Sequence, residues 1–544
     1  MGIPHQSIMY SRSMRHIFTR RQVQIWLATA AILIIFWRLF IFTDGFQGVW
    51  QIDRSGILQD SNLTKPEESP ETPQTPEVPV YTIEQRFRRA KEEHQRVLDH
   101  QSSNFDQAAK EYKRRYNIDP PKGFDKWFEY ATEQKSMIID DFDDVVAQTL
   151  PYRNFFKGSC DLVEMDGAFL DKHHMMQACI RDGKVTYNGQ GESWLKGAMT
   201  SMLADFAGAL PDLCFLINNL DEPRVLLPSD KLIPALEDTP AASFCESQSF
   251  LDLSHQEIWS EAILSCPAHS PAKLFPGREN NSATKKYVES WKSGTDLCLQ
   301  TAPIHHGMLQ SPTSLYVTHS VRPILSTAAL STFNDILFPS LWRFQRTGDY
   351  HAAADMSWEE KSNVAYWRGS TTGGYAQEDG WREFHRQRFV SFINDKQNNL
   401  NEKVDVRFTA VIQCDEHACD EEKRQFNLDD RQSASAGYNN KILFDLDGNG
   451  LSGRLYTLLR SNSAVMRQSI YREWHDSRLL PWLHYIPLSM ELQELPELLE
   501  YFLGDGDKIL ADIAKFGQEW ADASLRKEDM KIYLYRVLLE MSRR

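Results

Sequence analysis

Residues 441–460, KILFDLDGNGLSGRLYTLLR, decide the fold prediction, because they contain a buried strand, a glycine-rich turn and a helix in succession. The apolar run 442–444 predicts the strand, and the glycines after Asp447 predict the turn. The segment that follows has the period of a helix. A strand, a turn and a helix in this order are typical of an α/β protein.

The turn also matches the start of a calcium-binding EF-hand loop, because acidic or amide side chains stand at every second position. Such a loop needs a glutamate at its twelfth position to give the cation two oxygens. Counted from Asp445, the twelfth position is Tyr456. An apolar run precedes the turn, where an EF-hand requires an amphipathic helix. A calcium site is therefore not predicted, and the ligand of the turn stays open at this point.

Two regions of the chain alternate strand and helix patterns, which predicts parallel sheets. In the first region, an apolar strand at 213–217 ends in a polar loop that contains Asp221, and residues 331–340 supply a second loop. The second region contains a strand and glycine-rich turn at 363–374, a helix at 381–393, a strand at 405–412 and the stretch 441–460.

Ligands of parallel sheets lie beyond the carboxyl ends of the strands. Asp221, Arg368 and the turn at Asp447 fall at such ends. The tail, residues 507–540, predicts two amphipathic helices.

The charge balance and the N-terminal segment indicate the compartment. The net charge of -15 excludes a dominant basic surface for nucleic acid. Residues 25–43 form an apolar run with a single charge, about the length that spans a bilayer, and four arginines precede it. The positive-inside rule then predicts a cytosolic N-terminus and a lumenal remainder. A cleaved signal peptide is the rival interpretation, but no convincing cleavage site follows the run.

The lumenal interpretation explains several features beyond the run. Residues 61–79 contain five prolines and few apolar side chains, which predicts a solvated stem. Asn62 and Asn280 are predicted glycosylation sites. All eight cysteines follow the run, in a compartment that permits disulfides. Cys414 and Cys419 predict a small disulfide loop, because with one histidine they make an incomplete zinc set.

Two glycine-rich turns carry the chemistry that the residues themselves suggest. Arg368 stands before Gly-Ser-Thr-Thr-Gly-Gly, and Arg454 follows the second turn. Glycines let backbone amides approach an anion, and arginine can hold a phosphate through two N–H groups. A phosphate site and a purely structural turn both fit the first motif, and the second copy favours the phosphate site.

Ordered motifs resemble glycosyltransferase family 90, the capsule-associated and protein O-glucosyltransferase family, and its fungal capsule-associated branch in particular. The motifs are LPDLCFLINNLDEPRV, LSTFNDILFPS, YWRGSTTGG, HRQRFV, KILFDLDGNGLSGRLYTLLRSNSAV and EWHDSRLLPWLHYIPL, with EDMKIYLYRVLLE similar to the closing helix. The likeness spans roughly residues 120–540. It implies an α/β fold of the GT-B type, with two Rossmann-like domains and a cleft between them. It also implies inverting transfer of xylose or glucose from a UDP-sugar without a metal ion or another cofactor.

The resemblance also implies roles for individual residues. Asp221 matches the catalytic base of the family. Diphosphate binding is assigned to Arg368, Gly369, Ser370 and Arg454. Asp447, Ser452 and Asp335 are assigned to the same UDP-sugar cleft without a more specific role. Trp474, Trp482 and His484 lie in a further motif and are predicted to be core residues.

Two alternatives to this function remain open. The first is a metal-dependent transferase with a DxD motif, which Asp445-Leu446-Asp447 and Asp141-Phe142-Asp143 both match. The second is an inactive lumenal scaffold that keeps the fold without turnover. Loss of transfer with EDTA and rescue by manganese would favour the first alternative, and the absence of turnover with a panel of UDP-sugars would favour the second.

The predicted organisation follows from these features. It comprises a cytoplasmic tail at 1–24, a transmembrane anchor at 25–43, a stem at 44–82, an acceptor-side domain at 83–355, a UDP-sugar domain at 356–505 and C-terminal helices at 506–544. The anchor and stem, together with an ending MSRR in place of a KDEL-like signal, predict a type II membrane protein of the Golgi. The expected acceptor is a glycan, a polysaccharide or a glycoprotein.

Overall fold

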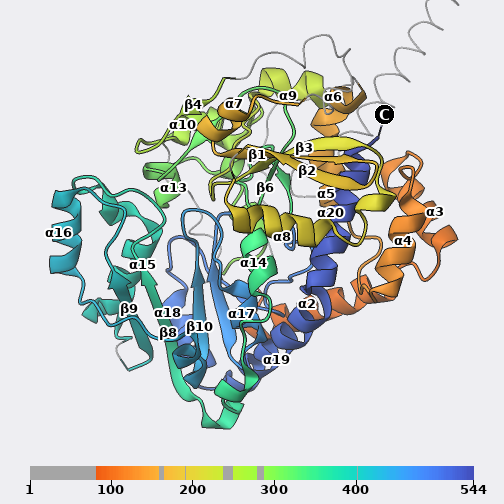
Figure 1. Cartoon of the computed structure of the whole chain (residues 1–544). Helices are drawn as coiled ribbons and strands as arrows, with labels where there is room; N and C mark the ends of the chain where they lie inside the picture. The colour runs from red at the N-terminus through yellow and green to blue at the C-terminus, as the bar shows by residue number, and fades with distance from the viewer. Residues whose placement is uncertain are drawn as a thin grey trace, which may run out of the picture. The chain divides into compact units, whose positions relative to one another are not determined.

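The computed structural model describes residues 81–157, 164–189, 191–236, 249–277, 287–400 and 402–543. Within these ranges the chain forms two five-stranded sheets and one two-stranded sheet (Figure 1). The predicted α/β class is confirmed.

The first sheet has the strand order β2-β1-β3-β6-β7. Its strands are β1 (Met175–Arg181), β2 (Lys184–Asn188), β3 (Leu213–Asn218), β6 (Ile324–Ser326) and β7 (Ile336–Leu337). Strands β3, β6 and β7 are parallel, whereas β1 is antiparallel to both β2 and β3. The prediction of parallel sheets is therefore wrong for strands β1 and β2 of the first sheet. Asp182 and Gly183 both have positive φ and close a two-residue hairpin between β1 and β2.

The second sheet has the order β12-β11-β10-β8-β9, and all its strands are parallel, as predicted. Its strands are β8 (Ser362–Ser370), β9 (Val404–Ala410), β10 (Asn440–Leu446), β11 (Ala464–Gln468) and β12 (Ile486–Pro487). The two-stranded sheet pairs β4 (Leu251–Asp252) with β5 (Tyr316–Val317).

Helices precede, connect and follow these strands. Before and around the first sheet they are α2 (Ile83–Asp99), α3 (Phe105–Tyr116), α4 (Phe124–Glu133), α5 (Asp143–Thr149), α6 (Arg153–Lys157), α7 (Gly167–Lys172), α8 (Ser193–Leu203), α9 (Ser229–Leu236), α10 (Trp259–Ala262), α11 (Pro271–Leu274), α12 (Trp291–Gly294), α13 (Gly307–Gln310) and α14 (Leu341–Arg346). Later helices are α15 (His385–Asn394), α16 (Glu416–Gln425), α17 (Leu455–Arg460), α18 (Leu495–Phe502), α19 (Asp507–Ser524) and α20 (Lys527–Met541).

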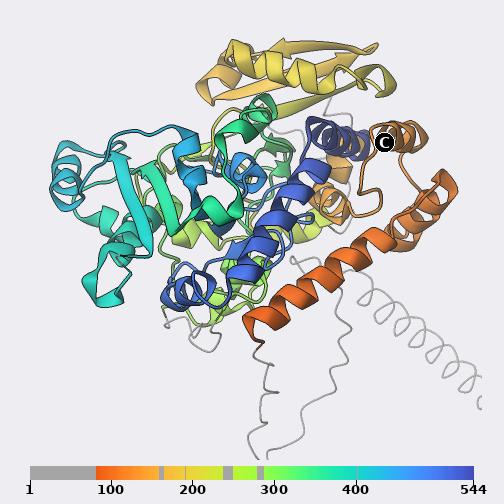
Figure 2. The same ribbon diagram turned by 90° about the horizontal axis from the view of Figure 1, so that it is seen from below.

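The first and last helices of the described chain each pack against elements that are far away in the sequence. Helix α2 packs beside α19, where Phe87 meets Phe516 and His94 meets Trp520 (Figure 2). Helix α20 instead packs against α4, α5 and α8. Each half therefore contains a helix from the other end of the sequence.

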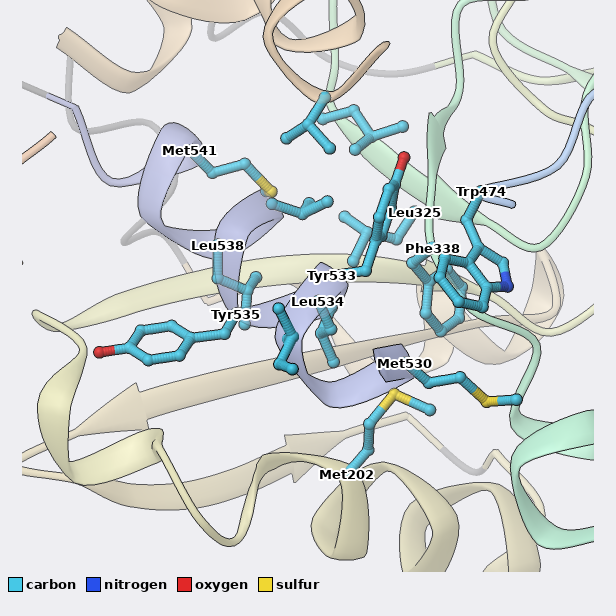
Figure 3. Close-up of a cluster of buried hydrophobic side chains, with 14 of the residues drawn as sticks. Met202, Leu325, Phe338, Trp474, Met530, Tyr533, Leu534, Tyr535, Leu538 and Met541 are labelled. Carbon is cyan, nitrogen blue, oxygen red and sulfur yellow. The ribbon is translucent and has the colours of Figure 1, made fainter. Parts of the chain in front are cut away.

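Helix α19 is amphipathic, as predicted, but α20 is not. Almost every side chain of α20 from Asp529 to Met541 is buried. Leu534 and Leu538 lie in an apolar cluster with Met202 of α8 and Leu325 of β6 (Figure 3). Because a helix enclosed on all sides has no solvent face, a pattern that assumes one misassigns it.

Candidate active site

Asp221 lies in the loop that follows β3, at the carboxyl end of the strand. Its side chain is exposed to solvent, yet protein surrounds it closely, and this partial burial raises the pKa of its carboxyl. A carboxylate that solvent reaches and that protein encloses suits a proton acceptor for a bound ligand.

Asp335, predicted to line the UDP-sugar cleft, instead forms hydrogen bonds to the backbone that follows Asp221. It is fully buried just before β7, and its two carboxyl oxygens accept the N–H groups of Arg224 at 2.8 Å and Val225 at 2.9 Å. The hydroxyl of Ser326 donates to the same carboxyl at 2.5 Å. Burial raises the pKa of Asp335 to about 6. The structure thus gives Asp335 a positioning role within the first sheet.

Glu222, next to Asp221, is a second acidic group that sequence reasoning missed. Its side chain is only 3% exposed and accepts the N–H of Ser314 at 3.1 Å. Burial and the neighbouring Asp221 carboxylate raise the pKa of Glu222 to about 8. The loop therefore carries one accessible carboxyl beside a buried one whose pKa lies well above the usual range of a glutamate.

Arg386 and Arg454 lie together at the carboxyl end of the second sheet. Arg386 donates to the carbonyls of Ser370 at 2.9 Å and Asp447 at 2.6 Å, and to the hydroxyl of Thr372 at 2.6 Å. Arg454 donates to the carbonyl of Arg368 at 2.6 Å. Among the described residues neither guanidinium forms an ion pair with a carboxylate.

The electrostatics of this pair indicate an anion site. Burial and the charge of Arg454 lower the pKa of Arg386 to about 9, and burial lowers the pKa of Arg454. Arg386 is buried and Arg454 is partly buried, and neither guanidinium forms a direct ion pair within the described ranges. Two adjacent cations of this kind repel each other, and a bound anion relieves that repulsion.

Arg368 has different partners from the diphosphate predicted for it. Its guanidinium donates to both carboxyl oxygens of Asp405 at 2.8 and 2.9 Å and to Asp429 at 2.7 Å. Strand β8 continues to Ser370, and successive side chains of a strand point to opposite faces. Trp367 is buried on one face, so Arg368 lies on the other. At Gly369 a β-carbon would lie 2.4 Å from the Trp367 ring, so the glycine leaves room for that ring.

The glycine-rich turn of the opening stretch reaches the Asp221 loop directly. A β-carbon at Gly450 would lie 2.5 Å from the carbonyl oxygen of Asp221 and 3.1 Å from its Cβ. Asn449 accepts the N–H of Gly373 at 3.0 Å, so the two glycine-rich turns are also joined to each other. The candidate base and both turns therefore meet in one place.

Asp447 and Ser452, predicted to lie in the cleft, are buried beneath the turn. Asp447 accepts the N–H of Ile470 at 2.8 Å, and Ser452 donates to Asp445. Asp447 also lies 3.5 Å from the imidazole of His306, and burial lowers the pKa of that imidazole to about 3. These groups shape the turn from inside.

The DxD segments have internal partners as well. Asp141, just before α5, and Asp143, its first residue, both pair with Arg115 of α3. The carboxyls of Asp445 and Asp447 bind the hydroxyl and N–H described above. In the parts of the chain that the structure describes, no group of three histidine, cysteine or acidic side chains is arranged to hold a metal ion.

The predictions for residues away from Asp221 and the two arginines have mixed outcomes. Trp474, Trp482 and His484 are buried, which confirms the core prediction. The disulfide Cys414–Cys419 is confirmed, and the structure adds Cys179–Cys214 and Cys266–Cys298. The predicted anchor at 25–43 and glycosylation sites Asn62 and Asn280 lie outside the described residues. Of the helices within the described ranges, none has the length and apolar character that a bilayer crossing requires.

Arg386 could have been found from the sequence, because it lies in the motif HRQRFV that carries the resemblance. Glu222 and Asn449 gave a weaker signal. Each is adjacent to a residue already singled out, but nothing in its own type indicates burial or a contact between distant turns.

An acidic strand-end loop that contacts the glycine-rich turn beside Arg386 and Arg454 is an arrangement suited to group transfer from an activated phosphate ester. Residues 307–544 match the family described as "Glycosyl transferase family 90". This segment of the chain belongs to glycosyl transferase family 90. It contains the second sheet and both arginines, whereas Asp221 lies upstream of it.

Curated relatives agree with this family. Protein O-glucosyltransferase 1 of Rattus norvegicus is 26% identical over 244 residues, which cover 41% of this chain and 57% of the rat protein. The O-glucosyltransferase rumi homolog of Aedes aegypti is 27% identical over 240 residues, or 40% of this chain and 54% of that protein. Protein O-glucosyltransferase 2 of Danio rerio is 33% identical over 98 residues, or 18% and 19% of the two chains. The chain thus spans little more than half the length of the first two relatives.

Proposed function

We propose that the protein is an inverting glycosyltransferase that moves glucose or xylose from a UDP-sugar to a hydroxyl group of a glycan or glycoprotein. The observation that carries the proposal is the contact between the Asp221 loop and the Gly450 turn, beside Arg386 and Arg454. The names of the relatives favour glucose as the donor sugar.

Asp221 acts as the general base in this proposal. It takes the proton from the acceptor hydroxyl while the oxygen of that hydroxyl attacks the anomeric carbon. The bond from that carbon to the β-phosphate oxygen breaks, and UDP leaves with the bonding electrons. Base catalysis of this kind typically contributes about 10²- to 10⁴-fold to the rate. The raised pKa of Asp221 makes it a better proton acceptor than an aspartate with an ordinary pKa.

Arg386 and Arg454 stabilise the negative charge that develops on the leaving diphosphate, together with backbone N–H groups of the glycine-rich turns. Two fixed cations can supply the charge that a divalent metal ion supplies elsewhere, so metal independence is part of the proposal. Arg368 contributes through its carbonyl, which orients Arg454 at 2.6 Å.

The finer fold assignment belongs to the same proposal. We assign a GT-B arrangement, with an acceptor domain at 83–355, a UDP-sugar domain at 356–505 and helices at 506–544. Two observations support this assignment. The carboxyl ends of strands from both sheets lie at one site, and helices α2 and α20 each pack against elements distant in the sequence. The predicted anchor, stem and lumenal Golgi location complete it.

The test uses the purified chain with UDP-glucose and UDP-xylose, with and without EDTA, and measures release of UDP. We expect one donor to be consumed, and consumption to survive EDTA. Loss with EDTA and rescue by manganese would support the DxD alternative. No turnover of any UDP-sugar, with UDP still bound, would support the inactive scaffold.

A further inference from the structure

Trp342 is a large aromatic side chain left in solvent beside the candidate site. It is the second residue of α14, which begins four residues after β7, and it is 46% exposed. Helix α14 lies between α8 and the second sheet (Figure 1). Burying an aromatic ring in a complex is favourable, so an exposed tryptophan beside the candidate site is suited to contact a ligand.

The indole lies directly against the turn that leads to Arg454. A β-carbon at Gly453 would lie 3.0 Å from Nε1 of Trp342. Gly450 of the same turn touches Asp221, and three residues of extended chain span at most about 11 Å. An acceptor whose hydroxyl lies at Asp221 can therefore reach the Trp342 ring.

The surroundings of Trp342 combine a second aromatic ring with charged groups. Trp194 of α8 meets it edge-on, with ring centroids 6.0 Å apart. The guanidinium of Arg346 lies 4.8 Å from the Trp342 ring. Glu192 accepts the indole N–H of Trp194, whereas the indole N–H of Trp342 donates to no acceptor among the described residues. The patch thus offers a flat apolar face, an open N–H donor and polar groups at the rim.

We propose that Trp342 and Trp194 form a subsite for a saccharide ring of the acceptor, which rests on the transferase function proposed above. A sugar ring has an apolar C–H face and hydroxyls around its edge, so it can stack on the indole while its hydroxyls meet Arg346, Glu192 and the free N–H. An extended peptide is bound instead along an open sheet edge or in a long groove. The occupant of this subsite is accordingly a carbohydrate ring.

The test measures glycan binding first without any donor. The wild-type chain is applied to an array of immobilised fungal, plant and animal glycans, and the dissociation constant of the best glycan is then measured by titration. Trp342→Ala should weaken that binding about tenfold or more, whereas Trp342→Phe, which keeps an aromatic face, should retain most of it. Phe105→Ala is the matched control, since Phe105 is 40% exposed at the start of α3.

Kinetics with the same glycan provide the second readout. In Trp342→Ala the KM for the glycan should rise more than kcat falls. Equal glycan binding by wild type and Trp342→Ala, or no glycan retained by the wild type, would overturn the subsite. Donor consumption is measured separately, so glycan binding without any turnover would contradict the transferase proposal and leave the glycan site supported.

Discussion

The strand ends of the two large sheets carry ionisable groups of opposite kind. The loop after β3 carries the carboxyl groups of Asp221 and Glu222, whereas the second sheet ends beneath the guanidinium groups of Arg386 and Arg454. Each set is held by its own sheet: Asp335 pins the acidic loop, and Arg386 binds carbonyls of the second sheet. The groups for proton transfer and those for anion binding are therefore held by different sheets, so a substitution in one set is expected to leave the other set intact.

The largest effect is expected from Asp221→Asn, which preserves shape but removes the proton acceptor. Transfer should fall by about 10²-fold or more, because the base is lost. Binding of UDP, measured by calorimetry, should stay within a few-fold, since the arginines lie on the other sheet.

Two results would contradict the separate roles of the two sheets. Transfer near the wild-type rate would mean that Asp221 only caps its loop, a role that asparagine also fills. A parallel loss of UDP binding would mean that the two edges are not separate.

A large loss of stability is expected from Leu534→Ala in α20. Leu534 is fully buried in the core of the first sheet, so its truncation leaves a cavity and should cost about 2–5 kcal/mol of unfolding free energy. Urea denaturation measures the change, with Glu519→Ala on exposed surface of α19 as the control. A loss below about 1 kcal/mol would show that the first core does not depend on α20.

The two arginine positions should differ when each becomes lysine. Arg454→Lys removes a planar donor from the anion site and should weaken UDP binding by roughly 10- to 100-fold. Arg368→Lys should weaken UDP binding less, because its guanidinium is already paired with Asp405 and Asp429. Calorimetric titration with UDP ranks the two variants, and the reverse order would return the diphosphate to Arg368.

Counted per pH unit, the smallest effect is expected from the titration of Glu222. Its pKa is raised from an ordinary value near 4.5 to about 8 in the fold, so the folded state binds an extra proton between these values. The stability that this proton provides is full below pH 4.5 and is lost as the pH rises through about 8. Between pH 5 and 8 the wild type should lose up to about 1.4 kcal/mol per pH unit from this group.

Glu222→Gln should remove that part of the slope. Urea denaturation at pH 5, 6, 7 and 8 compares the two proteins, and Glu519→Gln serves as an exposed control. Identical slopes for wild type and Glu222→Gln would show that Glu222 is ionised in the fold.

Local patterns predicted the second sheet better than the first. The apolar run before Asp445 became β10 because a continuous apolar stretch suits a strand buried on both faces. The antiparallel pair β1 and β2 was missed, although Asp182-Gly183 is a strong hairpin signal. A short-range signal of this kind is present in the sequence and indicates an antiparallel pair at this position.

The site was predictable in its residue types and less so in its contacts. Asp221 and Arg454 follow strand and turn patterns and lie at the expected edges. The partners of Arg368 depend on where β8 ends and on Asp405 of the neighbouring strand, which a single strand pattern does not contain. The role of Asp335 likewise depends on backbone groups about 110 residues earlier.

Helix α20 has a consequence for how this chain is made. The indole of Trp127 donates to the carbonyl of Ile532, a pair separated by 405 positions. During synthesis the segments around the first sheet therefore emerge from the ribosome long before the helix that fills their centre. Until then their apolar side chains are without a major partner, and such partly folded chains are prone to aggregation. The nascent protein is accordingly expected to need chaperone protection until α20 has been translated.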